Sequence, residues 1–448
     1  MPPPDERPTE IIPFEDGLEP ADIVDEHEEF EHEEFEDYDE YEGEFYDDEE
    51  ELDEAEHAEP EYIEDERPDR RGRRREKRSK RAFGWVAAIA VLALLVGGAW
   101  YGVNKIFGYD DFTGSGGSDV IVQVTSGDST NAIAGKLAGA GVVASAKAFV
   151  NAGASNTQIS KVQPGYYLLK KNMSGASAVS KIVSPTSRVG ELQIKAYTQL
   201  DDITQPDGKV TAGIYSLLSR SSCAEVNGKN TCIPVEDLRK TAESADLAAL
   251  GAPSWAVDSV TQAPQKDRRL EGLIAPGVYD IMPGWTATEL LTHMVKASAV
   301  QMQADGLNDK SGINGQSPYQ TLVIASIIER EAVQQDFGKV SRVIYNRLAV
   351  KMKLQMDSTV NYVLDKPVLA TNDADRAKPG AYNTYKNTGL PPTPISAPST
   401  EAVQAALSPP AGDWVYFIKC EKNGLSCFGV TADEHERNKA TAKANGAF

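Results

Sequence analysis

TLVIASIIEREAVQQDFGKVSRVIYNRL, residues 321–348, has the apolar periodicity of a helical run. The positions that share one helix face, at a spacing of i, i+3, i+4 and i+7, are Ile324, Ile327, Ile328 and Glu331. Glu331 therefore continues an apolar stripe. Glu329 points about 200° away around the helix, so we expect its side chain to be solvated or ion-paired.

Burial changes the acid–base behaviour of a carboxyl group on an apolar helix face. Loss of water disfavours the ionised form, so the pKa of Glu331 should rise and the group should hold a proton near neutral pH. A general acid needs this property. Glu331 is therefore the candidate catalytic residue.

The charge of the chain is concentrated near its amino terminus. Residues 1–66 contain 33 acidic residues and one arginine, whereas 67–81, RPDRRGRRREKRSKR, contain ten basic and two acidic residues. Because the whole chain carries −23, the part from residue 82 onward is nearly neutral at +1. Residues 1–66 are too charged to collapse and show no sustained period, which predicts a disordered acidic tail.

An uncharged run, AFGWVAAIAVLALLVGGAWYGV (82–103), has the length and the terminal aromatic residues of a membrane-spanning helix. The basic segment 67–81 precedes it, so the positive-inside rule places residues 1–81 in the cytoplasm and the rest outside the plasma (inner) membrane. A secretory signal peptide competes with this interpretation, but its apolar region would be shorter and would not follow an 80-residue tail. Nucleic-acid binding by the basic run is the weaker alternative to its juxtamembrane role.

The exported part contains four cysteines in two closely spaced pairs: Cys223 with Cys232, and Cys420 with Cys427. Each pair brackets an Asn-Gly dipeptide, which suits the tip of a hairpin. Two short-loop disulfides in an oxidising compartment are the economical interpretation. Zinc is the alternative, but this part has only two histidines, His293 and His435, and His293 reads as a satisfied helix histidine.

The exported part is expected to form an α+β protein of several segments. These are a Gly/Ser linker (104–118), a small strand-helix-helix-strand module (119–186), a connector without an assignable cluster (187–270) and a catalytic domain (271–448). The module resembles LysM-like glycan-binding modules in the order of its elements and in its Gly-Asp-Ser turn.

Polar residues that suit sugar recognition follow Glu331 in the sequence. They are Gln355, Asp357, Tyr382, Asn383 and Tyr385, with Thr384 between the last two. Amide groups beside tyrosine rings can orient sugar hydroxyl and N-acetyl groups. Each residue alone would read as a turn residue or a helix cap, and only their accumulation favours a substrate site.

Six motifs in this part resemble the endolytic murein transglycosylase (YceG-like) family: ASIIEREA, YNRL, LQMDSTVNY, YNTY, TGLPP, and VYFI with Glu434-His435. The match covers roughly residues 272–435. It implies cleavage of the bond between N-acetylmuramic acid and N-acetylglucosamine within nascent peptidoglycan strands, leaving 1,6-anhydro ends, without a cofactor. It also implies peptidoglycan as the partner, with cell-wall synthase or division proteins as further candidates and no nucleic acid.

The resemblance implies roles for individual residues. The family's catalytic glutamate falls on Glu331, with Glu329 as the fallback, and the five polar residues named above fall on substrate-groove positions. One departure is that Ser426-Cys427-Phe428 stands where relatives often show His-x-Phe. The resemblance therefore implies no histidine role at this position.

The single-glutamate mechanism also follows from chemistry. Glycoside hydrolases usually need two carboxylates, but the C6 hydroxyl of the muramyl sugar is a tethered nucleophile of high effective molarity. One glutamate could then act first as acid and later as base. Two other functions remain open: a non-catalytic peptidoglycan-binding membrane tether, and a hydrolytic muramidase that adds water.

Overall fold

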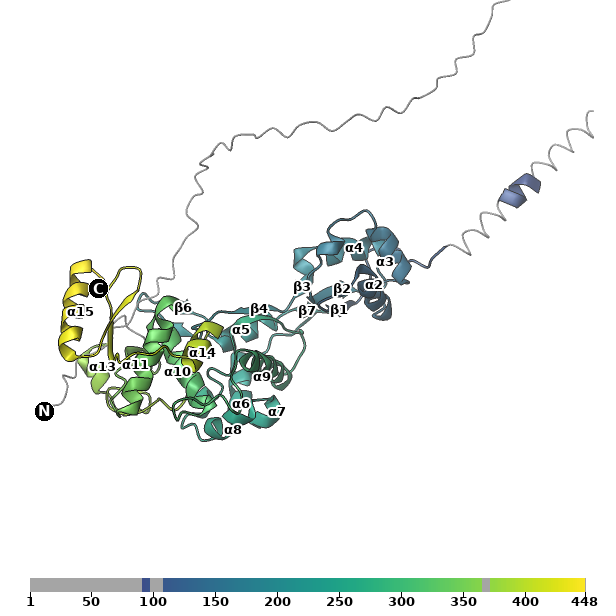
Figure 1. The fold of residues 1–448 in the computed structure, drawn as a ribbon. Helices are drawn as coiled ribbons and strands as arrows, with labels where there is room; N and C mark the ends of the chain where they lie inside the picture. Colours follow the sequence, from purple (N-terminus) through teal and green to yellow (C-terminus); the bar gives the residue numbers. More distant parts are fainter. Residues whose placement is uncertain (1–90, 97–107, 365–370, 448) are drawn as a thin grey trace, which may run out of the picture. The chain divides into compact units, whose positions relative to one another are not determined.

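The computed structural model describes residues 91–96, 108–364 and 371–447 (Figure 1). The predicted acidic tail (1–66) and basic segment (67–81) lie outside these residues, as does most of the predicted span (82–103), of which 91–96 are helical. Within the described ranges, every helix is too short or too polar to cross a bilayer. Residues from Tyr109 onward belong to one compact unit.

The first folded module has the predicted order of strand, helix, helix and strand. Its antiparallel sheet has the order β1 (Asp119–Val124), β2 (Gly165–Lys170) and β3 (Arg188–Val189). The helices are α2 (Thr130–Gly139), α3 (Ala146–Gly153) and α4 (Gly175–Ile182), and a serine caps the amino end of each. Phe149, Leu137 and Leu169 are among the side chains of a core separate from that of the following domain.

The segment before this module is bonded to it, unlike the flexible linker that its Gly and Ser content predicts. The backbone N–H of Gly117 donates to the Lys171 carbonyl at 2.8 Å, and the N–H of Gly175 donates to the Asp111 carboxylate at 2.9 Å. Residues 108–118 therefore form part of the module's surface.

The predicted connector and the predicted catalytic domain share one hydrophobic core. Strand β4 (Glu191–Ile194), from the connector, pairs antiparallel with β9 (Gly277–Asp280). The connector's helices are α5 (Ile214–Ser221), α6 (Val235–Ser244), α7 (Leu247–Leu250) and α8 (Ser254–Thr261), and its short hairpins are β5/β6 (Ile203–Thr204, Val210–Thr211) and β7/β8 (Glu225–Val226, Lys229–Asn230). Packing thus continues across the predicted boundary at residue 270.

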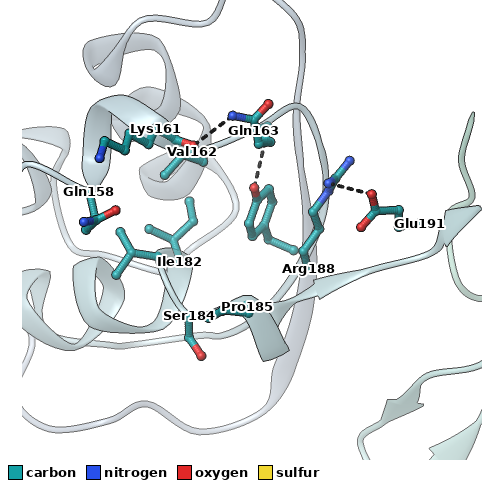
Figure 2. Close-up of a pocket in the computed structure, with 11 residues that line it drawn as sticks. Gln158, Lys161, Val162, Gln163, Ile182, Ser184, Pro185, Arg188 and Glu191 are labelled. Atoms are coloured by element: carbon teal, nitrogen blue, oxygen red, sulfur yellow. Dashed lines mark hydrogen bonds and ion pairs between the residues drawn. The ribbon is translucent and has the colours of Figure 1, made fainter. Parts of the chain in front are cut away.

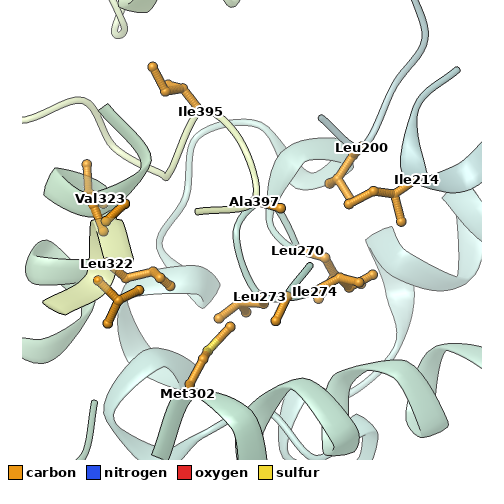
Figure 3. Packing of buried hydrophobic residues seen from close by; sticks show 14 of the residues in the cluster. Leu200, Ile214, Leu270, Leu273, Ile274, Met302, Leu322, Val323, Ile395 and Ala397 are labelled. Carbon is orange, nitrogen blue, oxygen red and sulfur yellow. The ribbon is translucent and has the colours of Figure 1, made fainter. Parts of the chain in front are cut away.

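Helix α10 (Pro318–Glu331) lies at the centre of this shared core. Ser317 and Gln320 form a capping box at its amino end, and Pro318 occupies a first-turn position that needs no N–H donor. The helix packs beside α11 (Phe337–Ala349) and α14 (Thr400–Leu407) (Figure 1). Figure 3 shows Leu322 and Val323 of α10 in the core to which 270–274 also contributes.

The single helical run predicted over 321–348 is wrong, because the structure divides it into α10 and α11. Ala332 adopts an extended conformation (φ −141°, ψ 162°), and a short 3-10 turn (Gln334–Asp336) precedes α11. The buried Asp336 carboxylate accepts a hydrogen bond from the Ser426 N–H at 2.6 Å, a partner distant in sequence. The break places Glu331 at the carboxyl end of α10.

The remaining elements complete a mixed α/β domain, in agreement with the α+β class predicted. They are α9 (Ala287–Ala304), α12 (Asp357–Asn361), α13 (Asp373–Ala377), the hairpin β10/β11 (Tyr416–Lys419, Ser426–Gly429) and α15 (Ala432–Asn445). Glu434 forms a capping box with Thr431 at the start of α15, and His435 stacks on Tyr416. Both predicted disulfides are present, Cys223–Cys232 and Cys420–Cys427.

We expect the Cys420–Cys427 disulfide to stabilise the β10/β11 hairpin. Replacing both cysteines by serine should lower the free energy of unfolding by about 2 kcal/mol, because the bond closes a short loop and removes unfolded conformations. Urea denaturation of the variant and the wild type measures this difference. Equal midpoints and slopes would mean that the hairpin gains no stability from the bond.

Candidate active site

The carboxyl group of Glu331 is fully buried, and its two oxygens have different surroundings. Oε1 accepts hydrogen bonds from the Ser358 N–H at 3.1 Å and from the Ser358 hydroxyl. Oε2 has no hydrogen-bond partner in the part of the chain that the structure describes. One oxygen is thus held in place while the other keeps its bonding capacity.

Burial raises the pKa of Glu331 to about 7, from an ordinary value of 4.5. The neighbouring Asp357 charge also raises this pKa, whereas the Ser358 hydrogen bonds and the Arg330 charge lower it. The carboxyl end of a helix disfavours negative charge as well, and Glu331 is the last residue of α10. Near neutral pH both protonation states are therefore accessible.

Asp357, at the start of α12, is fully buried and has all of its contacts inside the protein. It accepts a hydrogen bond from the Tyr385 hydroxyl at 2.6 Å and forms an ion pair with Arg376 at 3.2 Å. The hydroxyl and the N–H of Thr371 also donate to its carboxylate. Asp357 therefore holds residues 371–385 against α12.

Tyr382 and Asn383 also support this local structure. The Asn383 side-chain amide donates to the carbonyls of Arg376 and Lys378, at 2.9 and 2.6 Å. The Tyr382 hydroxyl shares a hydrogen bond with Thr393 at 2.8 Å. Both side chains are buried, so each is engaged before any ligand binds.

Gln355 has the most unusual backbone among the predicted site residues. Its φ of 51° lies in the left-handed region, where a residue with a side chain is strained, and its N–H donates to the Thr384 carbonyl at 3.2 Å. Its side-chain amide makes no hydrogen bond to the described residues. Gln355 thus combines a strained backbone with an unengaged amide, which is typical of a functional position.

The YNRL motif supports the site through hydrogen bonds to backbone carbonyls. Arg347 donates to the carbonyl of Leu354, directly before Gln355, and to that of Val415 at 2.6 Å. Asn346 donates to the carbonyls of Gly412 and Trp414. Burial lowers the pKa of Arg347 to about 10. The motif therefore fixes the backbone that enters the Gln355–Asp357 segment.

Glu329, predicted to be solvated or ion-paired, is partly exposed, and its carboxylate is hydrogen-bonded to Ser399. Its Oε2 accepts hydrogen bonds from the N–H and the hydroxyl of Ser399, at 2.9 and 2.6 Å, and burial raises its pKa. Ser399 caps the amino end of α14, which packs on α10. The side chain of Glu329 thus joins two helices.

Sequence reasoning missed Ser358, Arg376, Tyr362 and Glu271, which hold the site together. Ser358 lies inside the LQMDSTVNY motif, directly after Asp357, and this position could have identified it as a site residue. Nothing in the local pattern of EGLIAPGVYD marks Glu271. His293 lies on α9 against Trp285, and burial lowers its pKa.

The described residues offer no metal site. All four cysteines form disulfides, so none of them is a free thiol in this structure. No group of three or more His, Cys, Asp and Glu side chains within the described ranges could hold a metal ion.

A cavity of about 270 Å³ lies against the amino-terminal module (Figure 2). Its wall combines amide, cationic and apolar side chains, among them Gln158, Lys161, Val162, Ile182 and Arg188. Arg188 pairs with Glu191 at 3.2 Å. The cavity therefore offers both hydrogen-bonding groups and an apolar surface.

Comparison with known proteins identifies relatives along most of the chain. A model of the YceG-like family matches residues 122–441. The endolytic murein transglycosylase of Bacillus subtilis (strain 168) is 29% identical over 354 residues, which cover 77% of this chain and 90% of that protein. The endolytic murein transglycosylase of Streptococcus pneumoniae serotype 2 (strain D39) is 25% identical, and the match covers 79% of this chain and 64% of that protein. A crystal structure of a YceG-like protein from Listeria monocytogenes has 28% identity and a TM-score of 0.47, covering 71% of this chain and 98% of that one.

Replacing Glu331 by Gln should change how stability depends on pH. The folded-state pKa of about 7 exceeds the ordinary value of 4.5, so the folded protein binds this proton more tightly than the unfolded chain does. The stability that the folded state gains from this tighter proton binding is present below pH 4.5 and is lost as pH rises through 7. Glu331→Gln cannot titrate at this position, so it does not show this loss. Between pH 5 and pH 8 its free energy of unfolding should therefore rise by about 2 kcal/mol relative to that of the wild type.

Urea denaturation at several pH values measures this difference. Glu225→Gln, a change at an exposed strand position, is the matched control and should follow the wild-type curve. Parallel curves for wild type and Glu331→Gln would contradict the assignment of a buried, proton-binding carboxyl group.

Proposed function

This chain belongs to the YceG-like family, and we propose that it is a lytic transglycosylase that cleaves peptidoglycan glycan strands internally. The Bacillus relative, of which the chain covers 90%, is an endolytic murein transglycosylase. The observation that carries the proposal is the carboxyl group of Glu331, which is buried and has one oxygen without a partner among the described residues. No cofactor is needed for the reaction.

The proposed reaction has two proton transfers at Glu331 Oε2. The protonated carboxyl donates to the oxygen that joins N-acetylmuramic acid C1 to N-acetylglucosamine, and the C1–O bond breaks. The C6 hydroxyl of the same muramyl sugar bonds to C1 and gives its proton to the Glu331 carboxylate. The products are a free 4-hydroxyl and a 1,6-anhydro end, no water is consumed, and the carboxyl is again protonated.

Ser358 supports both halves of this cycle. Its two hydrogen bonds hold Oε1 in either protonation state, so the proton is carried by Oε2. They also favour the ionised form and limit the rise of the Glu331 pKa to about 7. A pKa near the working pH suits a group that must act as acid and then as base.

We propose that the glycan binds at the segment wall, defined by the five residues Gln355, Asp357, Tyr382, Asn383 and Tyr385. Gln355 would contact the sugar directly, because its amide is unengaged by the described residues and could bond an N-acetyl group. The other four residues stabilise the backbone around Gln355, since their polar side-chain atoms are already hydrogen-bonded within the protein. This division of roles follows from their contacts.

Two alternative functions make different demands on the chain. A non-catalytic tether would hold glycan at the amino-terminal module, and the cavity beside Lys161 and Arg188 favours that role for the LysM-like segment. A hydrolytic muramidase would need a second carboxylate to act on water. Asp357 is an unsuitable second group, because Arg376 and Tyr385 already bind it.

Un-crosslinked glycan strands incubated with the chain should yield internal fragments with 1,6-anhydromuramyl ends. Glu331→Gln should lower the rate by about 10²- to 10⁴-fold, because the general acid is lost. Mass spectrometry of the products measures both effects. Glu329→Gln is the comparison variant, and a larger loss there than at Glu331 would move the catalytic role to Glu329.

The identity of the products separates the alternatives. Reducing ends in place of anhydro ends would indicate a hydrolase. Intact strands that co-sediment with wild type and Glu331→Gln alike would indicate a tether.

We also propose that residues 82–103 anchor the protein once in the plasma (inner) membrane, with the tail in the cytoplasm and the catalytic domain outside. The uncharged run and the preceding basic segment support this, as do the two disulfides in the part predicted to lie outside the membrane. The acidic tail would then face cytoplasmic partners such as division or cell-wall synthesis proteins.

Leu92→Arg combined with Leu95→Arg should release the full chain from membranes. Each arginine near the centre of a span costs about 2.5 kcal/mol or more. Carbonate extraction of cell membranes tests this, with Val210→Arg, at an exposed valine of the connector, as the control. Extraction of the wild type by carbonate would contradict the anchor.

A further inference from the structure

A second glutamate, Glu271, is fully enclosed in the same domain, and the proposed reaction does not use it. Its Oε2 accepts hydrogen bonds from the Tyr362 hydroxyl at 2.8 Å and from the Leu200 N–H at 3.2 Å. Its Oε1 has no hydrogen-bond partner among the residues described. A buried carboxyl group is costly to keep unless it holds something in place.

Tyr362 links Glu271 to the catalytic carboxyl. Tyr362 directly follows α12 as its carboxyl-terminal cap, and its N–H donates to the Ser358 carbonyl at 3.0 Å. The N–H and hydroxyl of Ser358 in turn bind Oε1 of Glu331. A continuous path of hydrogen bonds and one helical turn therefore joins the two glutamates.

Helix α12 has five residues, too few to be stable alone, so its position depends on anchors at its two ends. At its amino end, Asp357 is held by Arg376 and Tyr385. At its carboxyl end, Tyr362 is held by Glu271. Ser358 lies between these anchors, one residue from the first and four from the second.

The environment of Tyr362 keeps its hydroxyl directed at Glu271. The Arg268 guanidinium lies 4.6 Å from the centre of the Tyr362 ring and donates to the Tyr362 carbonyl at 3.1 Å, while the Tyr382 ring lies 4.9 Å away. Burial raises the pKa of Glu271 to about 7, and the charges of Arg268, Asp201 and Arg330 act on it. In either protonation state Oε2 can accept both of its hydrogen bonds.

We propose that Glu271 is a positioning residue that acts through Tyr362 to keep Ser358 on Oε1 of Glu331. It does not touch the sugar. By fixing α12 it keeps the carboxyl of Glu331 oriented, so that Oε2 faces the scissile bond. This inference rests on the proposed function, because it assigns Glu271 to the same reaction.

Tyr362→Phe and Glu271→Ala, made in the full chain, should each lower kcat about tenfold with KM changed less than about twofold. Because both act along one hydrogen bond, the double variant should also lose about tenfold, not a hundredfold. Glu271→Gln should rescue most of the loss caused by Ala, since the amide oxygen can accept from Tyr362 and Leu200.

The pH profile separates positioning from a general loss of stability. Weaker Ser358 hydrogen bonds favour the protonated form of Glu331, so the alkaline limb of kcat/KM should move to higher pH in Tyr362→Phe. The other groups that influence Glu331 stay in place: Asp357, Arg330, Arg347 and Tyr385. Tyr279→Phe is the matched control, because it removes a buried hydrogen bond of 2.7 Å to the Ala275 carbonyl, and its limb should not move.

The outcomes distinguish this inference from the proposed function. Wild-type products with reducing ends, or strands left intact, would overturn the proposed function, whatever Glu271 does. An inactive Glu331→Gln beside a Tyr362→Phe with wild-type kcat and an unmoved alkaline limb would overturn the role of Glu271 alone. If Glu271→Ala does not fold, Tyr362→Phe and Glu271→Gln still decide the question, because both preserve the packing.

Discussion

The burial of one carboxyl group, that of Glu331, is the constraint on which the rest of the catalytic domain depends. Its raised pKa means that the folded protein is less stable with this group ionised. Helix α10 offsets that cost with a nearly complete set of buried apolar side chains, including Leu322, Ile324 and Ile328. Each such side chain contributes about 1.5 to 3 kcal/mol on burial, so two or three of them outweigh the cost of one dehydrated carboxylate.

Around this group the polar network is saturated, with a few unsatisfied atoms at the centre. Asp357 is tied to Arg376 and Tyr385, and Asn383 closes the backbone beside them. Among the described residues, Glu331 Oε2 lacks a partner, as do a few other buried atoms such as Glu271 Oε1 and Arg330 Nε. Buried polar groups in folded proteins are normally satisfied, so an unpartnered atom at the reacting centre, Glu331 Oε2, is where a ligand contact is expected.

The features that the sequence predicted were those set by local spacing. The apolar stripe placed Glu331 in the core because four positions within two helical turns decide which face is buried. Likewise, each cysteine lies within ten residues of its partner. The partner of Glu329 is Ser399, 70 residues away, and no local pattern reports such a contact. The end of α10 at Ala332 depends in the same way on distant contacts of the turn that follows it.

The number of usable carboxyl groups at the site favours a reaction with an internal nucleophile. Asp357 is the charged neighbour of Glu331, but its oxygens are occupied by Arg376, Thr371 and Tyr385. Asp357 is therefore not free to activate water, and Glu271, which is also buried, is held by Tyr362 and Leu200 through one oxygen. A sugar that supplies its own C6 hydroxyl needs no such group, and one carboxyl that changes protonation state near neutral pH is then sufficient.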